Sequence, residues 1–172
     1  MNLIAGNLCS LCAMAADAFS SSRKSAKSVL LVQIVSQFFY GLGTLILGGY
    51  SASAQNVVSI LRNLAAIRGI SKKWLEWTLV VLGVVLGLAC NTLGFIGLLP
   101  VLANLEYTLA IFRFKDDEQA LKLAFLVNVI LFGIFNVFIW NFIGLLSNIV
   151  VLVMLVVFLV KGQPSKQNPS KT

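Results

Sequence analysis

The alternation of seven long apolar segments with short turns is the feature that most constrains how this chain can fold. The apolar segments cover residues 2–19, 29–48, 51–69, 77–90, 95–112, 121–139 and 142–160. A helix of about 20 apolar residues spans the hydrocarbon core of a bilayer, whereas a single helix over 77–112 would be about 54 Å long and too long for it. We therefore expect an all-α membrane protein with seven transmembrane helices, whose first partner is the lipid bilayer.

Composition excludes most soluble classes of function. Of the 172 residues, 59% are hydrophobic and 11% are charged, compared with about 25% charged residues in soluble domains. The net charge of +7 comes from basic residues scattered between apolar segments, so the chain is not predicted to bind nucleic acid. With three cysteines and no histidine, the sequence predicts no metal site and no cofactor. No convincing pair of nucleophile and base is present, so we expect no catalytic residue and no enzyme activity.

The basic residues predict an orientation in the membrane. Twelve of the 13 lysines and arginines fall in the first, third and fifth loops and the tail, which share one side of a seven-span protein. The positive-inside rule then places the N-terminus outside and the C-terminus in the cytoplasm. Basic residues follow the first segment and do not precede it, which favours a retained helix over a cleaved signal peptide. The twelve are Arg23, Lys24, Lys27, Arg68, Lys72, Lys73, Arg113, Lys115, Lys122, Lys161, Lys166 and Lys171.

Polar side chains form stripes on the second and third segments. On a helix over 51–69 they occupy one face and leave the opposite face apolar. Lipid would penalise such a stripe, so it is expected to face other protein or water. The alternative is that single amides only hydrogen-bond across helices. The candidate substrate-binding residues are Gln55, Asn56, Ser59, Asn63, Gln33, Gln37, Asn128 and Asn148.

The order of segments is repeated along the chain. Residues 2–69 read as apolar run, basic loop, apolar run with amides, neutral turn and third helix, and residues 94–162 repeat that order. We therefore predict a first three-helix repeat over 1–69, a basic loop and linker helix over 70–93, a second repeat over 94–162 and a disordered cytoplasmic tail over 163–172. A linker of one span gives both repeats the same orientation, with the symmetry axis along the membrane normal and a site between them.

This 3+1+3 plan resembles that of the SWEET sugar facilitators and the PnuC vitamin transporters. Residues from about 29 to 162 are more closely similar to the YgjV family of bacterial inner-membrane proteins, through the segment 56–63 (NVVSILRN), the segment 97–100 (GLLP) and the Phe112-Arg113 end of the fifth segment. The resemblance to SWEET proteins implies a central pocket with one asparagine from each third helix, here Asn56 or Gln55 and Asn148. Pro100 is the one intramembrane proline and the hinge candidate, and the first half has no counterpart to it. The tryptophan-rich signature of PnuC is missing from the span interiors, so nicotinamide riboside is not implied as a substrate.

Asp17, Arg62 and Glu106 are charged residues in the interiors of the predicted spans, away from the ends that carry Arg68 and Lys122. Arg62 is expected either to pair structurally with Glu106 or Asp17 or to act as a gate, and both interpretations stay open. We expect a transporter or facilitator of a small polar metabolite in the bacterial inner membrane. The alternative is a non-transporting scaffold or partner subunit, and homo-oligomerisation is left open by the sequence.

Overall fold

The computed structural model describes residues 2–21, 26–70, 72–114 and 118–161. Within these ranges the chain is all-helical, with seven helices and no strand, which confirms the predicted helical segments. The second, fourth and sixth helices begin a few residues earlier than the sequence predicted. The predicted tail over 163–172 lies outside the described residues. The helices are α1 (Leu3–Ser21), α2 (Ala26–Ile46), α3 (Tyr50–Ile67), α4 (Lys73–Ala89), α5 (Phe95–Arg113), α6 (Glu118–Phe138) and α7 (Phe142–Lys161).

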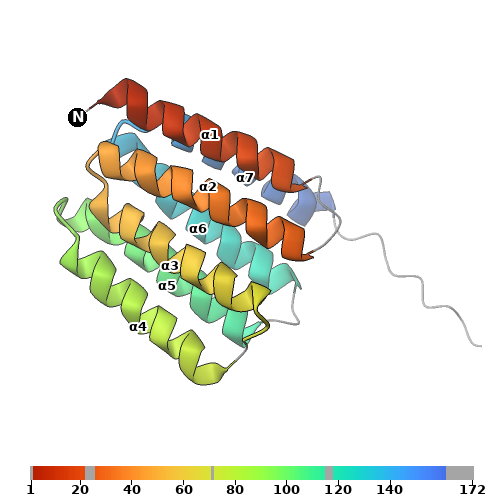
Figure 1. The fold of residues 1–172 in the computed structure, drawn as a ribbon. Helices are drawn as coiled ribbons and strands as arrows, with labels where there is room; N and C mark the ends of the chain where they lie inside the picture. The colour runs from red at the N-terminus through yellow and green to blue at the C-terminus, as the bar shows by residue number, and fades with distance from the viewer. Residues whose placement is uncertain (1, 22–25, 71, 115–117, 162–172) are drawn as a thin grey trace, which may run out of the picture.

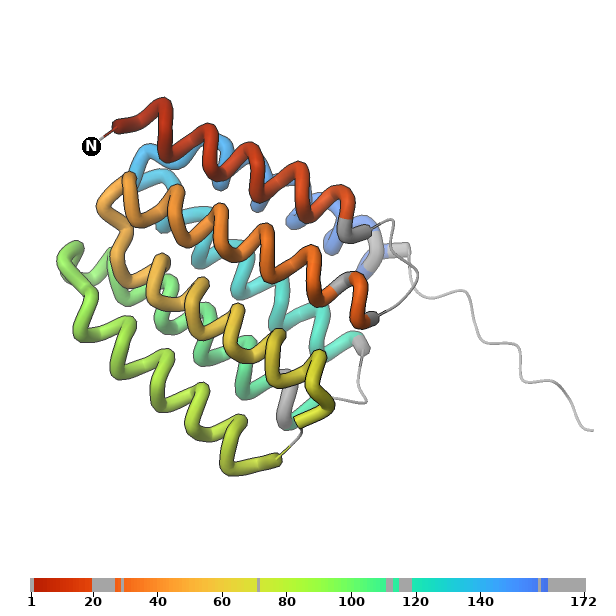
Figure 2. Tube along the Cα trace, viewed as in Figure 1, coloured from red at the N-terminus to blue at the C-terminus, as the bar shows by residue number. Residues whose placement is uncertain are grey.

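The helices run up and down along one common direction (Figures 1 and 2). In Figure 1, α1, α2 and α3 form a front row with α7, α6 and α5 behind them. Each helix packs against the next along the chain, and the contacts α1 with α7 and α3 with α5 join the two rows. Helix α4 lies at the edge of the bundle and packs against α3 and α5. The start of α1 and the end of α7 therefore lie at opposite ends of the bundle (Figure 1).

Two tight turns at one end of the bundle require unusual backbone conformations. Gly48, between α2 and α3, has φ +80°, and Trp140, between α6 and α7, has φ +58°. Glycine adopts positive φ without the clash that a Cβ atom creates, so Trp140 is the strained member of the pair. A small apolar core of Leu47, Ala52, Phe135 and Ile139 packs beside these turns. A Cβ atom on Gly49 would lie 2.9 Å from the Phe135 ring, so the turn needs glycine there to approach α6 closely.

The distribution of polar and apolar side chains is the reverse of that in a soluble protein. Many of the fully buried residues are polar, while large apolar side chains cover the outside of the bundle. In water, burial of apolar surface drives folding, so a soluble bundle buries these side chains and exposes the amides. The buried polar residues are Ser10, Ser36, Thr44, Ser51, Gln55, Asn56, Ser59, Asn63, Asn104, Thr108, Asn136, Asn141 and Ser147.

Helix length and hydropathy test the predicted spans one by one. In the described part of the chain, Gln119–Phe138 is both long and apolar enough to cross a membrane. Four further apolar stretches fall short of the required length: Leu3–Phe19, Leu30–Ile46, Phe95–Ala110 and Phe142–Val157. Hydropathy therefore supports one span clearly, and a seven-span arrangement remains a prediction.

Candidate functional site

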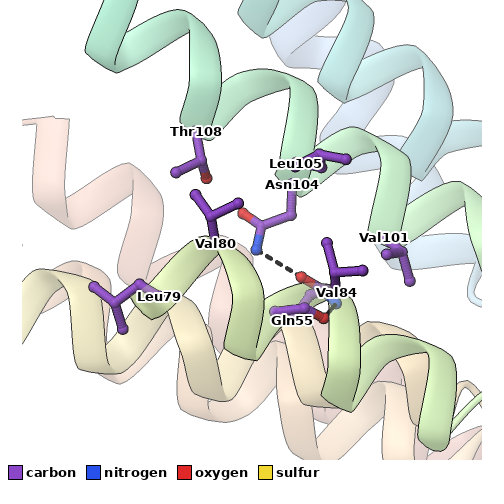
Figure 3. Close-up of a pocket in the computed structure, with 9 residues that line it drawn as sticks. Gln55, Leu79, Val80, Val84, Val101, Asn104, Leu105 and Thr108 are labelled. Atoms are coloured by element: carbon purple, nitrogen blue, oxygen red, sulfur yellow. Dashed lines mark hydrogen bonds between the residues drawn. The ribbon is translucent and has the colours of Figure 1, made fainter. Parts of the chain in front are cut away.

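Gln55 joins three helices through its side-chain amide. The side chain is 2% exposed. Its Nε2 donates to the Gly83 carbonyl on α4 at 2.8 Å. The Asn104 Nδ2 on α5 donates to Gln55 Oε1 at 2.6 Å (Figure 3). Both ends of the amide are thus occupied by protein, and Gln55 holds α3, α4 and α5 together.

The space beside Gln55 is small. The cavity between α3, α4 and α5 has a volume of about 10 Å³ and is lined by Gln55, Val80, Gly83, Asn104 and Thr108 among others (Figure 3). A single buried water needs about 10–15 Å³. This cavity is therefore close to the minimum for one water and too small for a metabolite.

Asn56 and Asn148 occupy corresponding places on α3 and α7. Asn56 faces Gly41 of α2, whose added Cβ would lie 3.2 Å from the Asn56 Cβ, and Asn148 faces Gly133 of α6, whose added Cβ would lie 3.8 Å from the Asn148 Cβ. Asn56 Nδ2 donates to the Ala52 carbonyl of its own helix at 3.0 Å. Asn148 Nδ2 is buried and has no hydrogen-bond partner among the described residues. An unsatisfied buried donor costs free energy, and the described interior provides no acceptor for the Asn148 amide.

A polar chain crosses from α1 through α2 to α7. The Asp17 carboxylate on α1 faces the hydroxyls of Ser36 and Tyr40 on α2 and interacts with both. The Tyr40 hydroxyl is 2.9 Å from Ser147 Oγ on α7, a hydrogen bond in which either atom can be the donor. Tyr40 thus links the front row of helices to the rear row.

The charged residues near the other end of α3 do not form the predicted ion pair. Neither Glu106 nor Asp17 makes a salt bridge to Arg62 in the described part of the chain, and Glu106 Oε2 is buried without a hydrogen-bond partner there. Tyr107, next to Glu106 on α5, interacts electrostatically with both Arg62 and Glu106. The three residues therefore share one neighbourhood, which keeps a gating role for Arg62 as a hypothesis.

The remaining predicted residues lie on several helices. Asn128 Nδ2 donates to the Ala103 carbonyl at 2.8 Å and joins α6 to α5. Ser59 and Asn63 are buried on α3. Gln33 and Gln37 are half-buried on α2. Pro100, the predicted hinge, is buried inside α5, which continues through it.

The sequence did not predict that Ser147 contacts Tyr40, nor which residues Asn7 contacts. Asn7 Nδ2 donates to the Trp140 carbonyl at 3.0 Å, and the Ile143 amide donates to Asn7 Oδ1 at 3.0 Å, so Asn7 fastens α1 to the α6–α7 turn. A single serine or asparagine in an apolar run carries no signal of its partner. The proximity of Asn148 was the one available pointer to Ser147.

Comparison with known proteins identifies a family and no individual relative. No curated protein and no solved structure matches the chain. The model of a family described as bacterial inner membrane protein, Imp-YgjV, matches residues 4–166. That match covers every helix almost completely, and a membrane protein family agrees with the apolar outer surface and the polar interior. The chain therefore belongs to the YgjV family of bacterial inner-membrane proteins.

Proposed function

We propose that this protein carries a small polar metabolite across the bacterial inner membrane, at a site between two like-oriented helix triplets, α1–α3 and α5–α7. Helix α4 is the linker between them. The N-terminus lies outside and the C-terminus lies in the cytoplasm. This proposal goes beyond membership of the family, which specifies the membrane alone.

The observation that carries the proposal is a constant spacing between the two triplets. Helices α1, α2 and α3 begin at Leu3, Ala26 and Tyr50, and α5, α6 and α7 begin at Phe95, Glu118 and Phe142, in each case 92 residues later. The ends of the first two helices of each triplet differ by the same 92 residues. The spacing also relates the residues with positive φ, Gly48 and Trp140.

Hydrogen bonds in the two turns follow this spacing. In the first turn, the Gly49 amide donates to the Thr44 carbonyl at 2.7 Å, and in the second, the Asn141 amide donates to the Asn136 carbonyl at 2.9 Å. The pairs Gly41 with Asn56 and Gly133 with Asn148 are related by the same 92 residues. This helix-ending hydrogen bond is common in proteins, but its recurrence at the same spacing as the helix starts and the glycine–asparagine pairs supports an internal duplication.

Helix contacts and charge support the rest of the arrangement. A twofold relation between the triplets exchanges the contact of α3 with α5 for that of α7 with α1, and both contacts exist. The described basic residues outside the helix interiors lie in the connections, or in the helix turns next to them, at the end of the bundle away from the N-terminus; they are Lys27, Arg68, Lys72, Lys73, Arg113 and Lys122. The positive-inside rule assigns that end to the cytoplasm.

Solute counterflow in proteoliposomes tests the proposal. Labelled monosaccharides, polyols, nucleosides and amino acids are offered to vesicles preloaded with the unlabelled compound. We expect saturable exchange of at least one class, lost in both Asn56→Ala and Asn148→Ala. Thr78→Ala is the matched control, because this exposed hydroxyl bonds only within α4, to the Trp74 carbonyl at 2.8 Å.

A scaffold or partner subunit is the second candidate, favoured by the occupied amide of Gln55 and the water-sized cavity beside it. Folded protein that exchanges no member of the panel faster than protein-free vesicles would support this second role and contradict transport.

A further inference from the structure

Asp17, four residues before the end of α1, places a carboxyl group against the middle of α2. Its partner Ser36 stands ten residues from either end of α2, which is about 15 Å along the helix axis in both directions. A charged carboxylate at such depth in a membrane protein is costly, and such groups commonly mark proton or ion pathways. Asp17 thus needs a physical reason to be there.

A hydroxyl group beside Asp17 can accept a hydrogen bond from a protonated carboxyl or donate one to an ionised carboxylate. Ser36 Oγ donates its own proton to the Gln33 carbonyl at 3.0 Å, so towards Asp17 it presents lone pairs. A hydroxyl has one proton and two lone pairs, whereas an ionised carboxylate accepts only. Ser36 therefore has no proton for the ionised carboxylate, and Tyr40 is the hydroxyl that can donate to Asp17 or accept from it.

Tyr40 couples the protonation state of Asp17 to hydrogen bonding on α7. Its hydroxyl faces Asp17 on one side and lies 2.9 Å from Ser147 Oγ on the other. With one proton, it donates to one neighbour at a time. The direction of the Tyr40–Ser147 hydrogen bond consequently depends on whether Asp17 is protonated and can donate, or ionised and can only accept. The residue after Ser147 is Asn148, whose Nδ2 is buried without a partner among the described residues.

We propose that Asp17 is a reversible proton-binding site whose occupancy sets the direction of the Tyr40–Ser147 hydrogen bond. When Asp17 is ionised, Tyr40 donates to the carboxylate and accepts from Ser147. When a proton from water binds, Asp17 donates to Tyr40, and Tyr40 donates to Ser147. The O–H formed on Asp17 is balanced by an O–H broken in hydronium, which leaves as water, while the Tyr40 and Ser147 hydroxyls rotate and keep their own protons. The Ser147 hydroxyl proton then turns to another acceptor on α7, beside the Asn148 amide.

Few other titratable groups lie on the helices that pack against α1, which are α2 and α7. On α2 they are Tyr40 and Lys27, and Lys27 is exposed in the first turn. From Phe142 to Val160, α7 contains none, and α1 itself adds Cys9 and Cys12. In the described part of the chain, no cation among these groups interacts with the Asp17 carboxylate. A carboxyl group lined by hydroxyl groups in this way is suited to bind a proton.

Infrared difference spectroscopy of the full-length protein in lipid, titrated with acid, tests this site directly. We expect a C=O band of a protonated carboxyl that is lost in Asp17→Asn and retained in Glu106→Gln, the matched intramembrane control. A tyrosine C–O band should change with the same midpoint and be lost in Tyr40→Phe. In Tyr40→Phe the Asp17 midpoint should shift by about one pH unit or more, as expected for loss of a hydrogen bond to a charged group.

Two results would overturn the proposal. One is the absence of any Asp17-dependent carboxyl band between about pH 4 and 9, a range wide enough to include most shifted carboxyl groups. The other is an Asp17 band that titrates while the tyrosine band stays constant. If Asp17→Asn does not fold, the midpoint shift in Tyr40→Phe decides the question. The titration needs no transported solute, so it can succeed where counterflow fails, and the reverse.

Discussion

Gln55 illustrates how one residue in this interior satisfies its polar groups. The position of Gln55 on the stripe of α3 predicted that it faces inward, and it is buried. Its partners, Gly83 and Asn104, could not be predicted, because helical periodicity defines a face and not the helix opposite it. The same limit applies to Arg62. Sequence spacing offered Glu106 and Asp17 as partners, but Asp17 lies against α2.

A double-mutant cycle measures the bond between Gln55 and Asn104. We expect Gln55→Ala and Asn104→Ala each to destabilise the protein, with a coupling energy of about 0.6–2 kcal/mol, the range for interhelical hydrogen bonds in membranes. Unfolding in mixed detergent micelles provides the measurement. The same cycle between Gln55→Ala and Thr78→Ala should give no coupling. A Gln55–Asn104 coupling of zero would show that this short contact contributes nothing to stability.

At the scale of helices and turns, sequence reasoning performed best where the pattern is long. The seven apolar segments correspond to the seven helices, because each continues for several turns. Helix starts were less accurate: the fourth segment was predicted to begin at residue 77, whereas α4 begins at Lys73. A loop rich in lysine and tryptophan carries no signal of where the first helical hydrogen bond forms. The positive φ of Trp140 was likewise unpredictable, since residues other than glycine rarely adopt it.

The strain at Trp140 gives a prediction with an internal control. Trp140→Gly and Trp140→Ala both remove the indole ring and its contact with Phe142. Only alanine retains a Cβ atom at φ +58°. We therefore expect Trp140→Gly to be the more stable variant by about 1 kcal/mol. Thermal unfolding in one detergent compares them, and an alanine variant of equal or greater stability would contradict the proposed strain.

For the whole molecule, the family and the apolar outer surface agree on the membrane, while the proposal of transport rests on the proposed duplication. The sequence suggested the duplication through the repeated order of segments in 2–69 and 94–162, and the helix starts recur at one spacing of 92. Polar residues in the two halves do not correspond one to one. Gln55 corresponds to Ser147 at this spacing, and Tyr40 corresponds to Phe132. Each half has thus acquired its own polar contacts on a shared framework.

The central claim is that the third helices of the two triplets face a path that water and solutes enter. Cysteine accessibility tests it most directly, in a chain whose three native cysteines are replaced by alanine. Asn56→Cys and Asn148→Cys are compared with Leu61→Cys and Met154→Cys, whose parent side chains are exposed on the outer faces of the same helices, α3 and α7. A small water-soluble thiol reagent reacts only with an ionised thiol, which requires water.

We predict that cysteines at positions 56 and 148 react at least about tenfold faster than those at 61 and 154, since thiols in apolar surroundings stay protonated. Reaction at 56 and 148 as slow as at the two lipid-facing positions would mean a permanently sealed interior. That result would contradict a solute path between the triplets.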